Sequence, residues 1–129
     1  MSSLRSRDFQ TIVIAEDTAD IRSLLALQLR MLGYTVYEAE DGWCAAQLAR
    51  EKSPDLVLMD LCMPRMNGFE ATKLIRQENA AASLKIVAFS AMSSNNEKVE
   101  ALAAGCDEFV EKSLEFDKVR AMVQRVLAN

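Results

Sequence analysis

The chain has 129 residues, the size of one ordinary domain, and its 50% hydrophobic and 26% charged residues exclude a disordered protein. The net charge of −4 argues against nucleic-acid binding as the main activity, since phosphate backbones favour a basic face. The absence of histidine excludes Ser-His-Asp and Cys-His catalysis, most catalytic zinc sites and phosphorylation on histidine.

Short apolar runs alternate along the chain with stretches of helical periodicity. We expect residues 1–9 to form a short N-terminal arm and residues 10–129 to form one domain. In chain order, the patterns predict a strand at 11–15 and a helix at 18–32, a strand at 35–39 and a helix at 43–52, a strand at 56–60 and a helix at 68–78, a strand at 85–90 and a helix at 94–104, and a strand at 108–111 and a helix at 114–128. Thr18 or Asp20 is expected to cap the first helix, and Gly33 and Gly105 to end the first and fourth.

This order repeats a strand followed by a helix five times. The central strands are continuous apolar runs rather than alternating ones, which indicates burial on both faces. Short loops and right-handed crossovers then predict an α/β fold, a (βα)5 doubly wound parallel sheet of five strands with helices on both sides.

Polar side chains stand where these predicted strands end. Glu16 and Asp17 follow the first strand, Asp60 ends the third, Ser90 ends the fourth and Lys112 follows the fifth. In a doubly wound sheet these ends meet at one edge. Taken singly, each residue has an ordinary interpretation, such as a helix-capping acid or a solvated charge. The combination is much less expected by chance, and a charge that ends an apolar strand needs a compensating partner.

Three clustered carboxylates repel one another, by about 4 kcal/mol for a pair at ~4 Å in a medium of effective dielectric ~20. One lysine cannot neutralise three acids, whereas a hard divalent cation such as Mg²⁺ can, together with water and a phosphate oxygen. Mg²⁺, the lysine and the serine hydroxyl would each stabilise charge on a phosphoryl group. A carboxylate can act as the nucleophile and give an aspartyl-phosphate.

The chain resembles the receiver domain of two-component response regulators over residues 10–128. The matching motifs are the acidic pair Glu16-Asp17, VLMDLCMPRMNGFE around Asp60, FSA at Ser90 and AAGCDEFVEK ending at Lys112. The resemblance implies the flavodoxin-like strand order 2-1-3-4-5. It also implies a signalling switch rather than an enzyme, one that promotes only its own Mg²⁺-dependent phosphorylation and dephosphorylation.

The resemblance further implies a role for each site residue. Asp60 accepts a phosphoryl group from a histidine kinase or a histidine phosphotransfer protein. Asp17 binds Mg²⁺ directly and Glu16 binds it through water, with Asp60 and the backbone carbonyl of Cys62 as further ligands. Lys112 pairs with Asp60 and then with the phosphoryl oxygens.

The same resemblance describes a change of shape after phosphorylation. Ser90 moves to bond the phosphoryl group, and Phe109 turns inward as the switch aromatic. The face made by helix 94–104, strand 108–111 and helix 114–128 then changes its protein partner.

The sequence departs from the family pattern in four respects, the last of which involves two positions. Ser90 replaces the usual Thr but keeps its hydroxyl, and Phe109 replaces the common Tyr and lacks one, so that it is equally well an ordinary core aromatic. Ser113 stands where a cis-proline is usual, and we predict a trans bond there because a non-proline cis bond costs roughly 2.5–4 kcal/mol. Cys62 and Met92 occupy positions that influence the attacking water, and neither orients water as an acid or amide does, so we predict slow self-dephosphorylation.

Two other classes of function remain open at this point. An enzyme on the same fold is disfavoured, because no glycine-rich phosphate loop follows the first strand and no second acid follows Asp60 by two residues. A pseudo-receiver, a phosphorylation-independent interaction module, would predict loss of the acids that this chain keeps.

The cysteines and the absence of export signals indicate where the protein is found. Cys44, Cys62 and Cys106 indicate free thiols, and neither a signal peptide nor an apolar run of membrane-spanning length is present. We therefore expect a cytoplasmic protein without a membrane or nucleic-acid partner.

Overall fold

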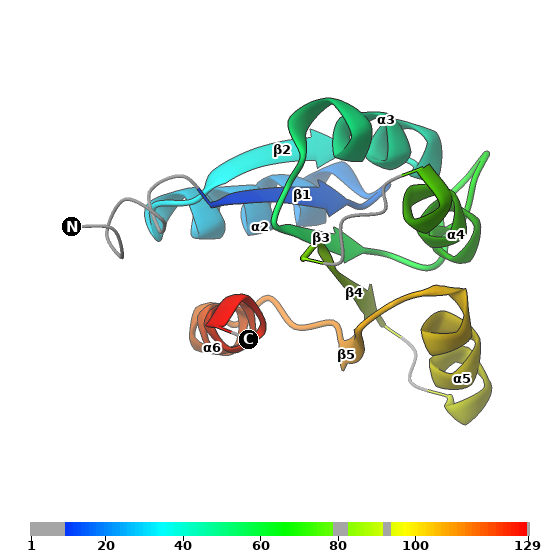
Figure 1. Cartoon of the computed structure of the whole chain (residues 1–129). Coiled ribbons are helices and arrows are strands. Elements are labelled where there is room, and N and C mark those ends of the chain that lie inside the picture. The colour runs from blue at the N-terminus through cyan, green and yellow to red at the C-terminus, as the bar shows by residue number, and fades with distance from the viewer. Residues whose placement is uncertain (1–9, 79–82, 92–93, 129) are drawn as a thin grey trace.

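The sheet places the ends of all five strands in a single parallel array. The computed structural model describes residues 10–78, 83–91 and 94–128. Their strands pair in parallel in the order β2-β1-β3-β4-β5 (Figure 1). The strands are β1 (Thr11–Ala15), β2 (Thr35–Ala39), β3 (Leu56–Met59), β4 (Lys85–Ser90) and β5 (Glu108–Glu111). The predicted α/β fold and strand order are confirmed, and the predicted arm at 1–9 lies outside the described residues.

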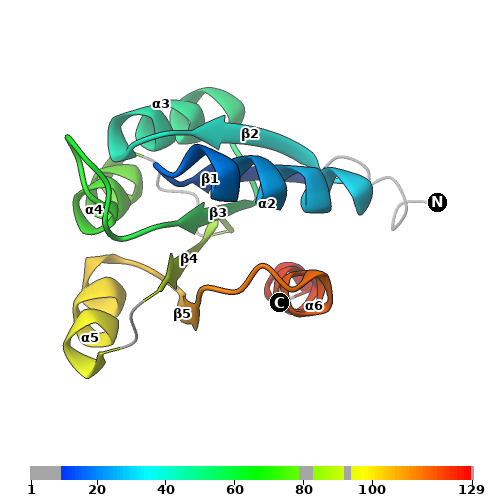
Figure 2. The same ribbon diagram turned by 180° about the vertical axis from the view of Figure 1, so that it is seen from behind.

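Helices cover both faces of this sheet (Figures 1 and 2). They are α2 (Ala19–Met31), α3 (Gly42–Lys52), α4 (Gly68–Glu78), α5 (Asn95–Ala104) and α6 (Phe116–Ala128). Helices α2 and α6 pack on one face, and α3, α4 and α5 on the other. Alternate strand residues enter the two cores, so that Ile12 and Ile14 face α2 whereas Val13 and Ala15 face the opposite side. Burial on both sides explains why the strands read as unbroken apolar runs.

Most predicted boundaries agree with the structure within one or two residues. Strand β3 ends at Met59, so Asp60 lies just beyond the ladder instead of closing it. Helix α2 begins after Thr18, whose side chain makes no capping hydrogen bond. Helix α6 begins at Phe116, two residues later than predicted, because Ser113 Oγ accepts a hydrogen bond from the Glu115 N–H in a local turn (3.2 Å).

Two close backbone contacts fix the loop between Asp60 and α4. Gly68 donates its N–H to the Leu61 carbonyl (3.1 Å), and a Cβ at Gly68 would collide with the Asp60 carbonyl oxygen. Gly42 donates to the Met66 carbonyl (3.0 Å), and a Cβ there would collide with that same oxygen. The loop after the third strand is therefore held against both its own helix and the start of α3.

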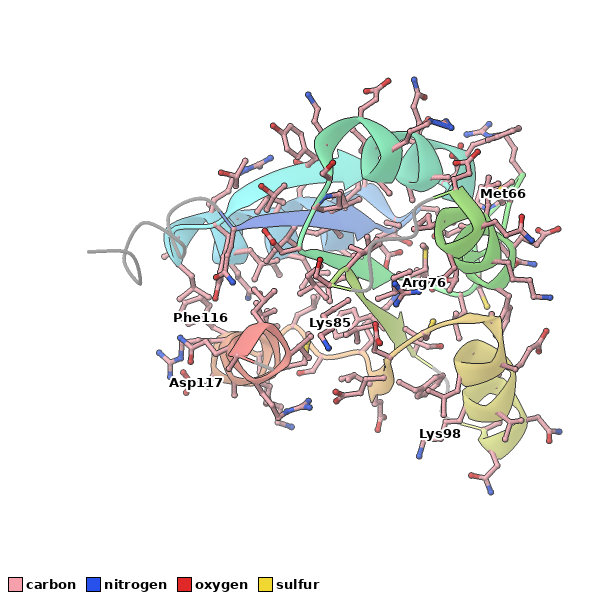
Figure 3. The ribbon with its side chains drawn as sticks, in the orientation of Figure 1. Met66, Arg76, Lys85, Lys98, Phe116 and Asp117 are labelled. Atoms are coloured by element: carbon pink, nitrogen blue, oxygen red, sulfur yellow. The ribbon has the colours of Figure 1, made fainter. Side chains whose placement is uncertain are left out.

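Long side chains tie the loops at the edges of the fold together. Arg65, in the left-handed region at φ 65°, donates from Nε to Asp41 Oδ2 (2.7 Å). Arg76 reaches from α4 to the carbonyls of Leu84 (2.8 Å) and Gly105 (2.9 Å), ahead of β4 and β5 (Figure 3). Within the described ranges, no helix has the length and apolar character needed to cross a membrane.

Candidate functional site

Four successive strands of the sheet, β1, β3, β4 and β5, carry polar or charged residues at or just past their carboxyl ends. Glu16 and Asp17 follow β1, Asp60 follows β3 and Lys112 follows β5, while Ser90 is the last residue of β4. Because the strands are parallel, these residues lie at one edge of the sheet. The structure thus brings together the residues that the sequence placed at strand ends.

A cluster of buried ion pairs lies at the carboxyl ends of these strands. The Lys112 ammonium lies 2.6 Å from Glu16 Oε1 and 3.6 Å from Asp60 Oδ2. Glu16 is only 2% exposed and Asp60 only 7%. The family resemblance implies that Lys112 pairs with Asp60. The structure contains this contact and a shorter one between Lys112 and Glu16.

The three acids are close enough to share one cation. Glu16, Asp17 and Asp60 each offer a carboxylate oxygen within 4.8 Å of those of the other two. Asp17, unlike the other two, is exposed to solvent. Oxygen-only ligands that combine buried and open positions suit Mg²⁺, which keeps several waters when it binds protein. The donor set therefore fits a hard divalent cation with an open side.

Burial and mutual repulsion shift the protonation of this cluster. Desolvation, followed by repulsion from Glu16, raises the pKa of Asp60 from 3.8 to about 6. Burial also opposes ionisation of Glu16, but hydrogen bonds from Lys112 and the Thr18 N–H outweigh it and leave the pKa of Glu16 below its ordinary value. Burial likewise opposes the charged form of Lys112, yet its two carboxylate partners raise its pKa. The charge of Lys112 thus favours ionisation of Glu16, whereas it balances the negative charge of Asp60 only in part.

Backbone groups and one arginine hold the acids in place. Glu16 Oε2 accepts the Thr18 N–H (3.1 Å), and Asp60 Oδ1 accepts the Cys62 N–H (3.2 Å). The guanidinium of Arg22, on the first turn of α2, donates to the Glu16 carbonyl (2.7 Å). The sequence did not indicate a role for Arg22, because an arginine five residues after the acidic pair is typical of an ordinary helix surface.

The other predicted site residues, Ser90, Phe109 and Cys62, differ in how far they are buried. Ser90 is buried, and its carbonyl accepts the Lys112 N–H (2.7 Å). Phe109 is half-buried against the core shared by α3, α4 and α5. Cys62 is an exposed residue, and partial desolvation of its thiol, followed by repulsion from Asp60, raises the pKa of that thiol.

Two predictions about the surrounding loops have different outcomes. The described residues contain no cis peptide bond, so the predicted trans bond between Lys112 and Ser113 is confirmed. Met92, the second position expected to influence the attacking water, lies outside the described residues.

Comparison with known proteins gives the same family throughout. The model of the response regulator receiver domain matches residues 12–124. The chain is 37% identical to the chemotaxis protein CheY of Bacillus subtilis, over 90% of this chain and 96% of that protein. It also matches several transcriptional regulators, of whose own length it spans about half, between 45% and 52%.

Solved structures agree with this result. Chemotaxis protein CheY4 of Vibrio cholerae superposes with a TM-score of 0.87 at 28% identity, covering 92% of this chain and 99% of that one. Response regulator TrrA of Thermotoga maritima, solved in complex with Mg²⁺ and BeF, gives a TM-score of 0.80 at 32% identity, covering 92% of this chain and all of that one (100%). The chain belongs to the family of response regulator receiver domains, the signalling modules of two-component systems.

Proposed function

We propose that this chain is a phosphoacceptor switch that takes a phosphoryl group on Asp60. The observation that carries the proposal is the position of this carboxylate. It is buried and lies 3.6 Å from the Lys112 ammonium, which balances its charge only in part. It also lies close enough to the carboxylates of Glu16 and Asp17 for all three to bind one cation. A purely structural carboxylate would have no reason to share its site with two more acids.

Receiver domains bind Mg²⁺ at such an acidic cluster, and the donors here fit that ion. Asp17 and Asp60 would hold it directly and Glu16 through water, with the backbone carbonyl of Cys62 as a further ligand. The bound ion would supply positive charge that offsets repulsion among the acids and stabilises the transferring phosphoryl group.

The chain's own residues then divide the transfer between them. An oxygen of Asp60 attacks the phosphorus, and the bond between phosphorus and the donor's histidine nitrogen breaks as the new acyl-phosphate bond forms. Lys112, already 3.6 Å from the carboxylate, neutralises charge on the transferred oxygens. Hydrolysis of the acyl phosphate by water later restores Asp60.

The proposed donor is a histidine kinase or a histidine phosphotransfer protein, because receiver domains interact with proteins of these classes. This chain has no histidine of its own that could carry the phosphoryl group. Its three cysteines are free thiols, which supports a reducing, cytoplasmic location. The net acidic charge of −4 favours protein partners over nucleic acid.

The response to phosphorylation would pass through Ser90 and Phe109 to the face formed by α5, β5 and α6. Ser90 would bond the phosphoryl group and Phe109 would turn inward. This face offers apolar surface for a downstream protein, since Val99 and Leu102 on α5 are 66% and 51% exposed. A small, mostly apolar pocket of about 100 Å³ lies between β5 and α6, lined in part by Val110 and Met122.

Phosphorylation of Asp60 is tested by intact mass after incubation with Mg²⁺ and acetyl phosphate. We expect a gain of one phosphoryl group in the wild type and none in Asp60→Asn or with EDTA, because the carboxylate nucleophile or the cation is then missing. No gain in the wild type, together with no response to beryllofluoride, would leave the pseudo-receiver interpretation.

Metal binding is predicted to depend on Asp17. Asp17→Asn removes one of three acids around the site, and we expect Mg²⁺ or Mn²⁺ affinity to fall at least tenfold in calorimetric titration, about 1.4 kcal/mol. Asp20→Asn is the matched control, because Asp20 is an exposed acid in the first turn of α2 outside the cluster. Equal losses in the two variants would place the cation elsewhere.

The raised pKa of Asp60 predicts a pH-dependent effect of Asp60→Asn on stability. The folded state keeps the Asp60 proton up to pH about 6 whereas the unfolded chain loses it near pH 3.8, so the wild type loses stability as pH rises between these values. Without metal, Asp60→Asn should therefore be more stable than the wild type above pH 6 and nearly equal to it at pH 4. Urea unfolding in EDTA at both pH values measures the difference, and a gap that is the same at both would contradict the assignment.

Slow decay of the phosphorylated form is predicted from the exposed thiol at Cys62. A thiol is a weak hydrogen-bonding group, whereas an amide both donates and accepts. Cys62→Asn should accelerate loss of phosphate several-fold, measured by mass after removal of the phosphodonor. Cys44→Asn, a thiol outside the acidic cluster, is the control, and a decay rate for Cys62→Asn no faster than the wild type would refute this role.

A further inference from the structure

The segment that leads from Lys112 to α6 has little structure of its own. Residues 112–115 belong to neither β5 nor α6, and Ser113 supplies only a local turn through its hydroxyl. Serine does not fix its backbone as proline would. On its upstream side the segment is anchored by the hydrogen bond from the Lys112 N–H to the Ser90 carbonyl (2.7 Å). On its downstream side another group must hold it.

Gln28, in the third turn of α2, supplies that hold. Its Nε2 donates to the Leu114 carbonyl at 2.9 Å, across 86 positions of the chain. The side chain is only 8% exposed. Its helix neighbours Leu25 and Leu29 belong to the apolar core between α2 and α6, and Leu114 packs against the same core. A hydrogen bond in such surroundings is screened little by water.

The other end of the same amide is unsatisfied. Gln28 Oε1 is buried and accepts no hydrogen bond among the described residues. A buried acceptor without a partner is unfavourable, and an apolar side chain of the same length would avoid that cost. Core packing therefore does not account for glutamine at this position, whereas the bond to Leu114 does.

We propose that Gln28 is a positioning residue for Lys112. By fixing Leu114 to α2, it keeps the segment after β5 in the course that holds the lysine ammonium 2.6 Å from Glu16 and 3.6 Å from Asp60. Helix α2 starts at Ala19, two residues after Asp17, so the same helix is connected to the acids and, through Gln28, to the segment that carries the lysine. This role rests on the proposed phosphorylation of Asp60.

The test is Gln28→Met, which keeps length and volume but removes the donor and the unsatisfied acceptor. We expect the melting temperature and the Mg²⁺ affinity to stay near the wild-type values, while phosphorylation by acetyl phosphate slows about three- to tenfold as the lysine loses its fixed position. Backbone ¹⁵N order parameters at 113–115 should fall. Gln124→Met, the same change at an exposed position of α6, is the control and should alter none of these properties. If Gln28→Met folds poorly, Gln28→Leu takes its place in the experiment.

A double-mutant cycle separates positioning of Lys112 from a general effect on the fold. In a Lys112→Ala background, Gln28→Met should cause no further loss of phosphorylation rate. An unchanged rate for Gln28→Met alone, the same fold-loss in both backgrounds, or a rate loss that parallels weaker Mg²⁺ binding would each overturn the proposal. A wild type that is not phosphorylated at all would instead remove the proposed function, and this role with it.

Discussion

Two carboxylates buried beside a single ammonium group are the constraint on which the rest of the site depends. Glu16 and Asp60 lie at the carboxyl ends of adjacent strands, and Lys112 approaches both but lies closer to Glu16. Desolvation and repulsion leave Asp60 as the group that bears the imbalance, with a pKa of about 6. Because the surroundings of Asp60 disfavour its negative charge, they favour binding of a cation beside it. A bound cation would in turn favour a phosphoryl group on this carboxylate.

The fold creates this constraint through backbone contacts that leave little room for adjustment. Gly68 and Gly42 allow the loop after Asp60 to lie directly against neighbouring backbone, where a Cβ would collide. The Thr18 N–H donates a hydrogen bond to the Glu16 carboxylate, and the Cys62 N–H donates one to the Asp60 carboxylate. The acids are thus preorganised by parts of the chain that contribute no catalytic side chain, which is the arrangement that electrostatic stabilisation requires.

The lysine side of the site is held differently from the acid side. Asp60 follows a central strand covered on both faces. Lys112 instead follows β5, an edge strand, and leads into a segment without regular structure. Gln28 on α2 supplies a cross-link to this segment, and α6 begins immediately after it. The mobile part of a switch would therefore be expected on the β5 and α6 side, next to the apolar surface of α5, while the acids remain fixed.

The sequence by itself determined the order of the ten elements, the acids at the ends of the strands and the family, because these follow from local periodicity and from motifs of short span. It did not determine where α6 starts, because the turn at Ser113 competes with the helical pattern. Nor did it show that Lys112 lies nearest to Glu16, or that Gln28 bonds Leu114. These contacts join residues 96 and 86 positions apart, and side-chain distances of that kind are decided only when the helices pack on the sheet.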